Sequence, residues 1–128
     1  LRESEATLLR AQEVAHIGSW RIDFRSGNLT WSPEVYRIFG VATSTVISYE
    51  TFLDCVHPDD REMVDAAWQA SLAGAPYHIQ HRIVVAGETR WVEKRAQIAF
   101  HDAHHPRKAV VTEQDTTDRK SAETRIQY

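Results

Sequence analysis

The sequence predicts an α+β domain in which five antiparallel strands form one sheet and short helices cover one of its faces. Segments whose apolar residues alternate, as in half-buried strands, lie near both ends of the chain, and segments with helical spacing lie between them. This grouping favours an antiparallel sheet with its helices on one side. The 128 residues suffice for one hydrophobic core, and the 42% hydrophobic and 26% charged content is ordinary for a soluble globular domain.

Residues 1–16 contain neither Gly nor Pro and are predicted to form a helix. One stripe of this helix has the 3-4 spacing of a coiled coil and includes Leu1, Leu8, Ala11 and Ala15. The helix either lies on its own domain or pairs with a second copy of the chain. About two heptads are too few to choose between these interpretations.

A β-hairpin is predicted over residues 18–32. Trp20, Ile22 and Phe24 share one face of the first strand, Gly27 begins the turn, and a second short strand follows to Trp31. Ser32 and Pro33 then start a short helix that ends at Gly40.

Two more helices are predicted in the middle of the chain, over residues 49–56 and 60–73. Asp59 followed by Glu62 resembles a capping box for the longer one, which ends at the sequence Gly-Ala-Pro, and His57 is expected to complete its start.

Three longer strands fill most of the remaining sequence. Residues 77–85, residues 92–100 and a strand that begins near Ala109 alternate in polarity, with turns at Gly87 and in the segment HDAHHP. The segment QDTTDRK then marks the passage from strand to helix, with Thr117 or Asp118 as the N-cap. We therefore divide the chain into a flanking helix (1–16), a core (17–116) and the start of an exit helix (117–128).

Composition excludes several classes of function. The net charge is −3 with both signs interspersed, which gives no basic surface for nucleic acid. No apolar run reaches the roughly 18 residues of a membrane span, so we expect no membrane insertion in this segment. The lone Cys55 allows no internal disulfide and fits a reducing compartment, so a cytoplasmic location is expected.

Neither catalysis nor metal binding is predicted. No nucleophile stands with a base, the glycines are scattered singly, and the adjacent Asp59 and Asp60 are explained by the field at a helix N-terminus. Four possible metal ligands fall in one predicted loop, which we interpret as a solvated polar turn: His101, Asp102, His104 and His105. Of His78 and His81, only one can point into the core, as a structural histidine.

A ligand pocket between sheet and helices is possible, although aromatic residues more often fill a core. Its candidate lining is Ile22, Phe24, Phe39, Trp68, Ile83 and Ile98. Trp91 has the outward parity of its strand, and its cover would be the N-terminal helix or a partner subunit.

The chain resembles a PAS domain of the kind found in bacterial sensor histidine kinases and cyclic-di-GMP enzymes. The resemblance spans residues 5 to 121 and rests on the order of five motifs: AHIGSWRIDF, LTWSPEVYRIFG, VHPDDRE, ETRWVE and QDTTDRKSAE. It implies a sheet in the order 2-1-5-4-3. Three residues depart from the family pattern, namely Val111, Glu113 and Thr116.

The resemblance also bears on cofactors. Flavin-binding members of the family carry an Asn-Cys-Arg-Phe run, whereas Cys55 lies in LDCVHP and is interpreted as a small buried hydrophobe. Haem-binding members need a histidine on the long helix, and residues 60–73 contain none. We therefore expect neither a flavin photoadduct nor haem, and the ligand, if any, stays unidentified.

The leading hypothesis is a sensory or dimerisation module of a multidomain bacterial signalling protein, a histidine kinase or a cyclic-di-GMP enzyme. Asp115, Thr116 and Thr117 would pass its state to a linked output domain, where any catalysis would reside, and a homodimer is expected. The alternatives are a small α+β ligand carrier or isomerase-like enzyme with a conical sheet, and a passive interaction module.

Overall fold

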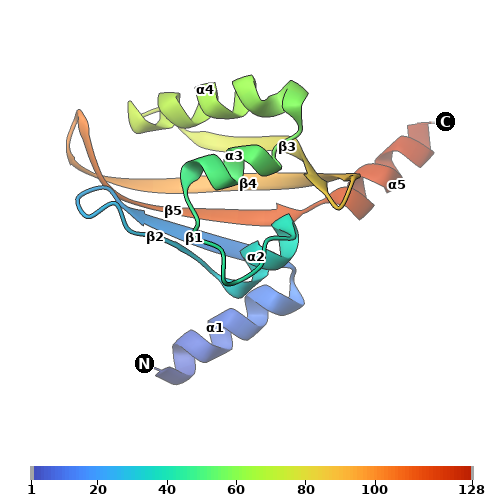
Figure 1. Cartoon of the computed structure of the whole chain (residues 1–128), viewed down its shortest axis with the longest axis horizontal. Helices are drawn as coiled ribbons and strands as arrows, with labels where there is room; N and C mark the ends of the chain where they lie inside the picture. Colours follow the sequence, from blue (N-terminus) through green and yellow to red (C-terminus); the bar gives the residue numbers. More distant parts are fainter. Residues whose placement is uncertain (1, 128) are drawn as a thin grey trace.

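A computed structural model describes the backbone of residues 2–127 and the side chains of residues 6, 7 and 10–123. Its one sheet has five strands, all paired antiparallel, in the order β2-β1-β5-β4-β3 (Figure 1). The strands are β1 (Ile17–Asp23), β2 (Leu29–Trp31), β3 (Tyr77–Val85), β4 (Glu88–Asp102) and β5 (His105–Asp115). The predicted fold class and strand order are confirmed.

Helices α3 and α4 lie over one face of the sheet, while α1 and α5 lead away from it at the two ends of the chain (Figure 1). The helices are α1 (Arg2–Val14), α2 (Pro33–Phe39), α3 (Tyr49–Cys55), α4 (Arg61–Leu72) and α5 (Thr117–Gln127), with a 3₁₀ turn at Pro58–Asp60. None of the described helices is long and apolar enough to cross a membrane.

Helix α2 packs directly against β1 because Gly18 has no side chain. A Cβ atom at this position would lie 2.6 Å from Cγ2 of Val35 and 2.9 Å from its backbone nitrogen. The hydrophobic core between sheet and helices is rich in aromatic residues, among them Trp20, Trp31 and Trp68, each about 5% exposed.

The last two strands are longer than the sequence predicts. Most of the segment HDAHHP is paired, because β4 runs to Asp102 and β5 begins at His105. Strand pairing continues there through irregular register between residues 99 and 102. Helix α5 begins at Thr117, which is therefore its first residue and not its N-cap, and the Asp115 carboxylate accepts a hydrogen bond from the Thr117 N–H (2.9 Å).

Candidate functional site

An ion pair lies in the middle of the hydrophobic core. Lys94 and Glu113 are register partners on β4 and β5, and Nζ of Lys94 lies 3.1 Å from Oε1 of Glu113. Their side chains are only 1% and 0% exposed. The indole N–H of Trp20 donates to the same carboxylate oxygen at 3.0 Å. A buried charge is tolerated only with such partners, so this carboxylate is held in one orientation from two sides.

Three aromatic rings surround the Lys94 ammonium. Nζ lies 3.5 Å from the ring centroid of Phe52, 5.4 Å from that of Trp20 and 5.8 Å from that of Tyr77. The negative faces of such rings attract a cation, most strongly where water is excluded. Burial lowers the pKa of Lys94, and the neighbouring Glu113 opposes that shift.

His81 is the inward histidine of β3, and its side chain is fully buried against Phe52, with ring centroids 5.9 Å apart. Nδ1 lies 3.1 Å from the carbonyl oxygen of Arg82, which can only accept, so Nδ1 carries the proton in the neutral ring. Burial, aided by the charge of Lys94, lowers the pKa of His81 to about 4. The ring is therefore neutral at physiological pH, and Nε2 is an acceptor.

Several buried polar atoms around this pair have no hydrogen-bond partner among the described residues. They are the Tyr77 hydroxyl, Nε2 of His81, Oε2 of Glu113 and Nζ of Lys94 itself, whose contact with Glu113 is an ion pair. Each unsatisfied buried group costs about 1–3 kcal/mol. The core thus retains unused hydrogen-bonding capacity beside the ion pair.

A cavity of about 30 Å³ lies beside Trp20 and Phe52, enough for about two water molecules. Its lining is Trp20, Ile22, Leu29, Trp31, Ser48, Tyr49, Phe52 and Trp68. Of the predicted pocket residues, Ile22 and Trp68 line it, whereas Phe39 and Ile83 are buried in the core. Phe24 stacks on Trp68 at 6.4 Å, and Ile98 lines a separate hollow beside Pro76.

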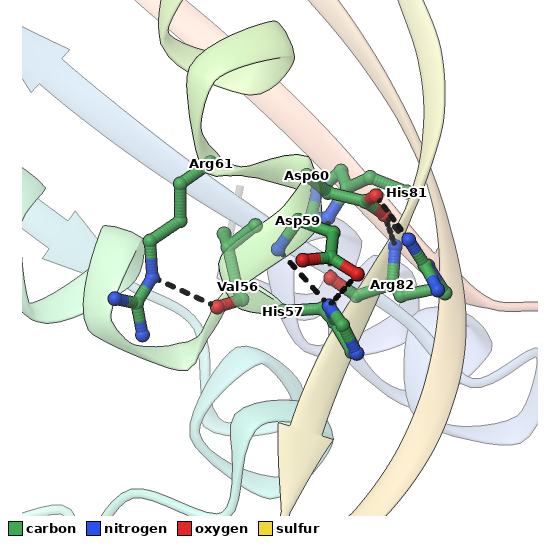
Figure 2. Close-up of polar contacts among 7 residues, drawn as sticks. All are labelled: Val56, His57, Asp59, Asp60, Arg61, His81 and Arg82. Atoms are coloured by element: carbon green, nitrogen blue, oxygen red, sulfur yellow. Dashed lines mark hydrogen bonds and ion pairs between the residues drawn. The ribbon is translucent and has the colours of Figure 1, made fainter.

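The start of α4 is fixed to β3 next to His81 (Figure 2). The Asp60 carboxylate accepts hydrogen bonds from the backbone N–H of Arg82 (2.8 Å) and from its guanidinium (2.7 and 3.1 Å). The Arg82 guanidinium thereby holds the pKa of Asp60 below its usual range. His57 accepts from the Asp59 N–H through Nδ1 (3.1 Å), as expected of a residue that completes the helix start.

The junction of β5 with α5 is tied to β4 by three hydrogen bonds, and a fourth joins Asp115 to Thr117 within the junction. The Asp115 carboxylate accepts from Nε of Arg90 (2.6 Å) and from the Thr117 N–H, and the Thr117 hydroxyl accepts from the Trp91 N–H (3.0 Å). The Thr116 N–H donates to the Trp91 carbonyl (2.8 Å). Burial alone would raise the pKa of Asp115, but the hydrogen bonds from Arg90 and Thr117 outweigh it and lower that pKa.

Thr116 and Trp91 of this junction differ in burial and in contacts. Thr116 is 4% exposed, and its buried hydroxyl has no partner within the described part of the chain. The Trp91 ring is covered by the ammonium of Lys120 from α5, 4.8 Å from the centroid, with the Arg82 guanidinium at 6.0 Å. Among the described side chains, the cover of Trp91 therefore comes from the exit helix through Lys120.

The predicted dimer stripe of α1 is only partly described. Leu1 lies outside the described residues, as does the side chain of Leu8. Ala11 and Ala15 are exposed, and Val14 beside them is 82% exposed. This end of α1 is not buried on its own domain.

The histidine-rich hairpin forms a local polar turn. Oδ1 of Asp102 accepts from the His104 N–H (2.8 Å) and lies 2.7 Å from Nδ1 of His105. Across the residues that the structure describes, no three His, Cys, Asp or Glu side chains gather as a metal site would require.

The comparisons with known proteins agree on one family. A family model described as "PAS fold" matches residues 28–112. The chain is 40% identical over 112 residues to a blue-light-activated histidine kinase of Brucella ovis, which covers 87% of this chain and 22% of the kinase. The chain therefore spans about a fifth of that relative.

Solved structures support the same relationship. A sensory box histidine kinase/response regulator from Burkholderia thailandensis superposes with a TM-score of 0.75 at 29% identity, covering 94% of this chain and 92% of that one. An RNA-binding light-oxygen-voltage receptor gives 0.69 at 27% identity, covering 80% of this chain and 30% of the receptor.

These relatives correct the cofactor prediction. We expected no flavin photoadduct, but the kinase with 40% identity is activated by blue light, and the structural neighbours include light-oxygen-voltage proteins. Another light-oxygen-voltage structure, with a TM-score of 0.61 at 14% identity over 94% of this chain and 93% of that chain, shows the same fold. The prediction that a flavin is unlikely in this chain was therefore wrong.

The cavity between the aromatic rings is much smaller than a flavin site would need to be. Ligand sites typically measure about 300–1,000 Å³. Rings such as Phe52 and Trp68 would have to move apart to widen the 30 Å³ cavity to that size. Cys55 is half-buried against the core, its thiol donates to the Thr51 carbonyl (3.4 Å), and burial raises its pKa.

With the family model, the curated relative and the strand order in agreement, the chain belongs to the PAS-fold family.

Proposed function

We propose that this PAS domain is the sensory module of a cytoplasmic bacterial signalling protein, a histidine kinase or a cyclic-di-GMP enzyme. It relays its state through the junction of β5 and α5 to a linked output domain, where catalysis resides. The similarity to sensor histidine kinases supports the class of protein. The observation that carries the relay is the Asp115 carboxylate, which binds β4 through Arg90 and α5 through Thr117.

The junction is suited to transmit a small displacement. Glu113 and Asp115 lie two residues apart on β5, so both side chains point to the face of the sheet that carries the core. A change at the Lys94–Glu113 pair would therefore shift the strand that holds Asp115. A coupling of about 1–3 kcal/mol between core and exit helix is the usual scale for such a relay.

Blue light is the first input to test, because the kinase with 40% identity is activated by it. An absorption spectrum of the purified protein between about 350 and 500 nm distinguishes a bound flavin from a colourless ligand. Native mass spectrometry then separates a sensor with a small-molecule ligand from a passive interaction module.

A homodimer formed through α1 is part of the proposal. Ala11, Val14 and Ala15 present small and apolar side chains that the described residues of the domain do not bury. Light scattering should give twice the chain mass, and Val14→Glu should shift it to the monomer while the far-ultraviolet circular dichroism stays unchanged. A monomeric wild type would contradict this part.

The relay is tested in the full-length protein with Asp115→Ala. The variant should stay folded and lose the difference in output between stimulated and unstimulated states. Asp118→Ala is the matched control, because Asp118 lies in the same first turn of α5, whereas the hydrogen bonds to Arg90 and Thr117 come from Asp115. An undiminished response in Asp115→Ala would refute the relay.

A further inference from the structure

We propose that Trp20, Phe52, Tyr77 and Glu113 form a binding site for an organic ammonium group, and that this chain fills the site with its own Lys94. We call these four residues the ammonium cage. The inference concerns what occupies the core and does not depend on the proposed relay.

The surroundings of the Lys94 nitrogen match the recognition of an ammonium ion. One carboxylate oxygen lies at 3.1 Å, and three rings lie between 3.5 and 5.8 Å from the nitrogen. Aromatic rings with an acidic partner are how proteins bind alkylated ammonium groups. The two components come from different elements, Phe52 from α3 and Glu113 from β5, so the cage is assembled by the fold.

The unused polar atoms favour a donor as the guest. An ammonium has three donors and no acceptor. Oε2 of Glu113 and Nε2 of His81 are buried acceptors without a partner in the described structure, and the Tyr77 hydroxyl can also accept. Arg82, the nearest guanidinium along β3, is engaged by Asp60 and does not compete for Glu113. A carboxylate guest would meet Glu113 and three ring faces, all of which repel it.

Lys94 fills the cage as a tethered guest. Because its backbone is fixed in β4 opposite Glu113, the effective concentration of its ammonium exceeds that of any free amine in solution. Wild-type protein should therefore not bind added amines in the cage. Truncation to alanine removes three carbons and the nitrogen, the shape of n-propylammonium, and extends the adjoining 30 Å³ cavity.

The experiment is a thermal unfolding series on Lys94→Ala with n-propylammonium chloride, against equal concentrations of sodium chloride and of 1-propanol. At ten times the dissociation constant the ammonium should raise the midpoint of Lys94→Ala by about 4 °C. It should not change the midpoints of wild type or of Lys94→Ala/Glu113→Gln. An equal effect of 1-propanol, or an unchanged effect in the double variant, would show simple cavity filling and overturn the proposal.

If Lys94→Ala does not fold alone, n-propylammonium should refold this variant and restore the fluorescence of its buried tryptophans. A measurement on wild type then gives a second test. Independently, the ε-methylene protons of Lys94 should resonate upfield of ordinary lysines because they lie over the Phe52 ring, and Phe52→Leu should abolish most of that shift. Ordinary lysine shifts in wild type would contradict the cage.

Discussion

Lys94 and Glu113 form an ion pair with both side chains at most 1% exposed, within a core made mostly of aromatic and aliphatic residues. Taking both charges out of water is expensive, and their attraction offsets the cost only while each keeps its partner. The pair is therefore a point at which single and double substitutions should differ sharply.

Lys94→Met and Glu113→Gln should each lower the free energy of unfolding by about 3–5 kcal/mol, because each leaves one buried charge uncompensated. The double variant should recover most of the loss, since Met fills the lysine volume and Gln still accepts from the Trp20 indole. Urea unfolding of all four proteins measures the coupling. Additive losses would mean that the two residues do not stabilise each other.

Because the pKa of the buried His81 is lowered, we expect the free energy of unfolding to fall in mild acid. Its folded pKa is about 4, below the unfolded value near 6.5, so the unfolded chain binds more protons between these values. The contribution of His81 is complete above about pH 6.5 and falls as pH drops toward 4, by on the order of 3 kcal/mol. The free energy of unfolding measured from pH 7 to pH 4 should show this decline.

His81→Gln should flatten the decline because it removes the titrating ring. His78→Gln is the matched control, since His78 lies on the opposite face of β3 with half of its side chain exposed. A decline that persists in His81→Gln would assign it to other groups.

Because the pKa of Asp60 is lowered, we expect a second fall in the free energy of unfolding at lower pH. Arg82 lowers its folded pKa, so its contribution is present above the unfolded value of about 4 and is lost as pH falls through the folded value. Asp60→Asn should weaken the protein at pH 7 and reduce the slope of stability below pH 4. Asp59→Asn, at a side chain that is 76% exposed, should behave like wild type.

Gly18→Ala tests the close packing of α2 on β1. The added Cβ would meet Val35 at 2.6 Å, so either α2 or β1 must shift, at a cost of about 1–3 kcal/mol. Val35→Ala in the same chain relieves the side-chain contact but not the backbone contact at 2.9 Å, so recovery should be incomplete. If Gly18→Ala were as stable as wild type, α2 and β1 would be able to move apart at little cost, which would contradict the close packing.

The fold was predictable because its signals are local. Alternation gave the strands, and Ser, Pro and Gly gave the helix ends, including Gly40, which ends α2 with a positive φ of 67°. The exit junction was also predicted as a strand-to-helix turn with Asp115 and Thr117 as the residues that tie it. Their bonds to Arg90 and Trp91 depend on the register of β4 and could not be read from the turn alone.

The centre of the site was missed for the same reason. Lys94 has the inward parity of its strand, but a lysine there breaks the apolar pattern that predicts a core residue. Glu113 stands out in the sequence only as a departure from the family pattern. Each is explained by the other, and that pairing follows from the β4–β5 register. The cavity was placed only in part, because its walls depend on how large rings such as Trp31 and Phe52 pack.

The relay through the junction is tested most directly by a double-mutant cycle on output in the full-length protein. Arg90→Ala, Asp115→Ala and the double variant should each lose the difference between stimulated and unstimulated output to the same extent, because the two residues act through one 2.6 Å contact. Arg95→Ala, at an exposed arginine on the same strand, should keep it. A full response in either single variant, or losses that add in the double variant, would contradict the account.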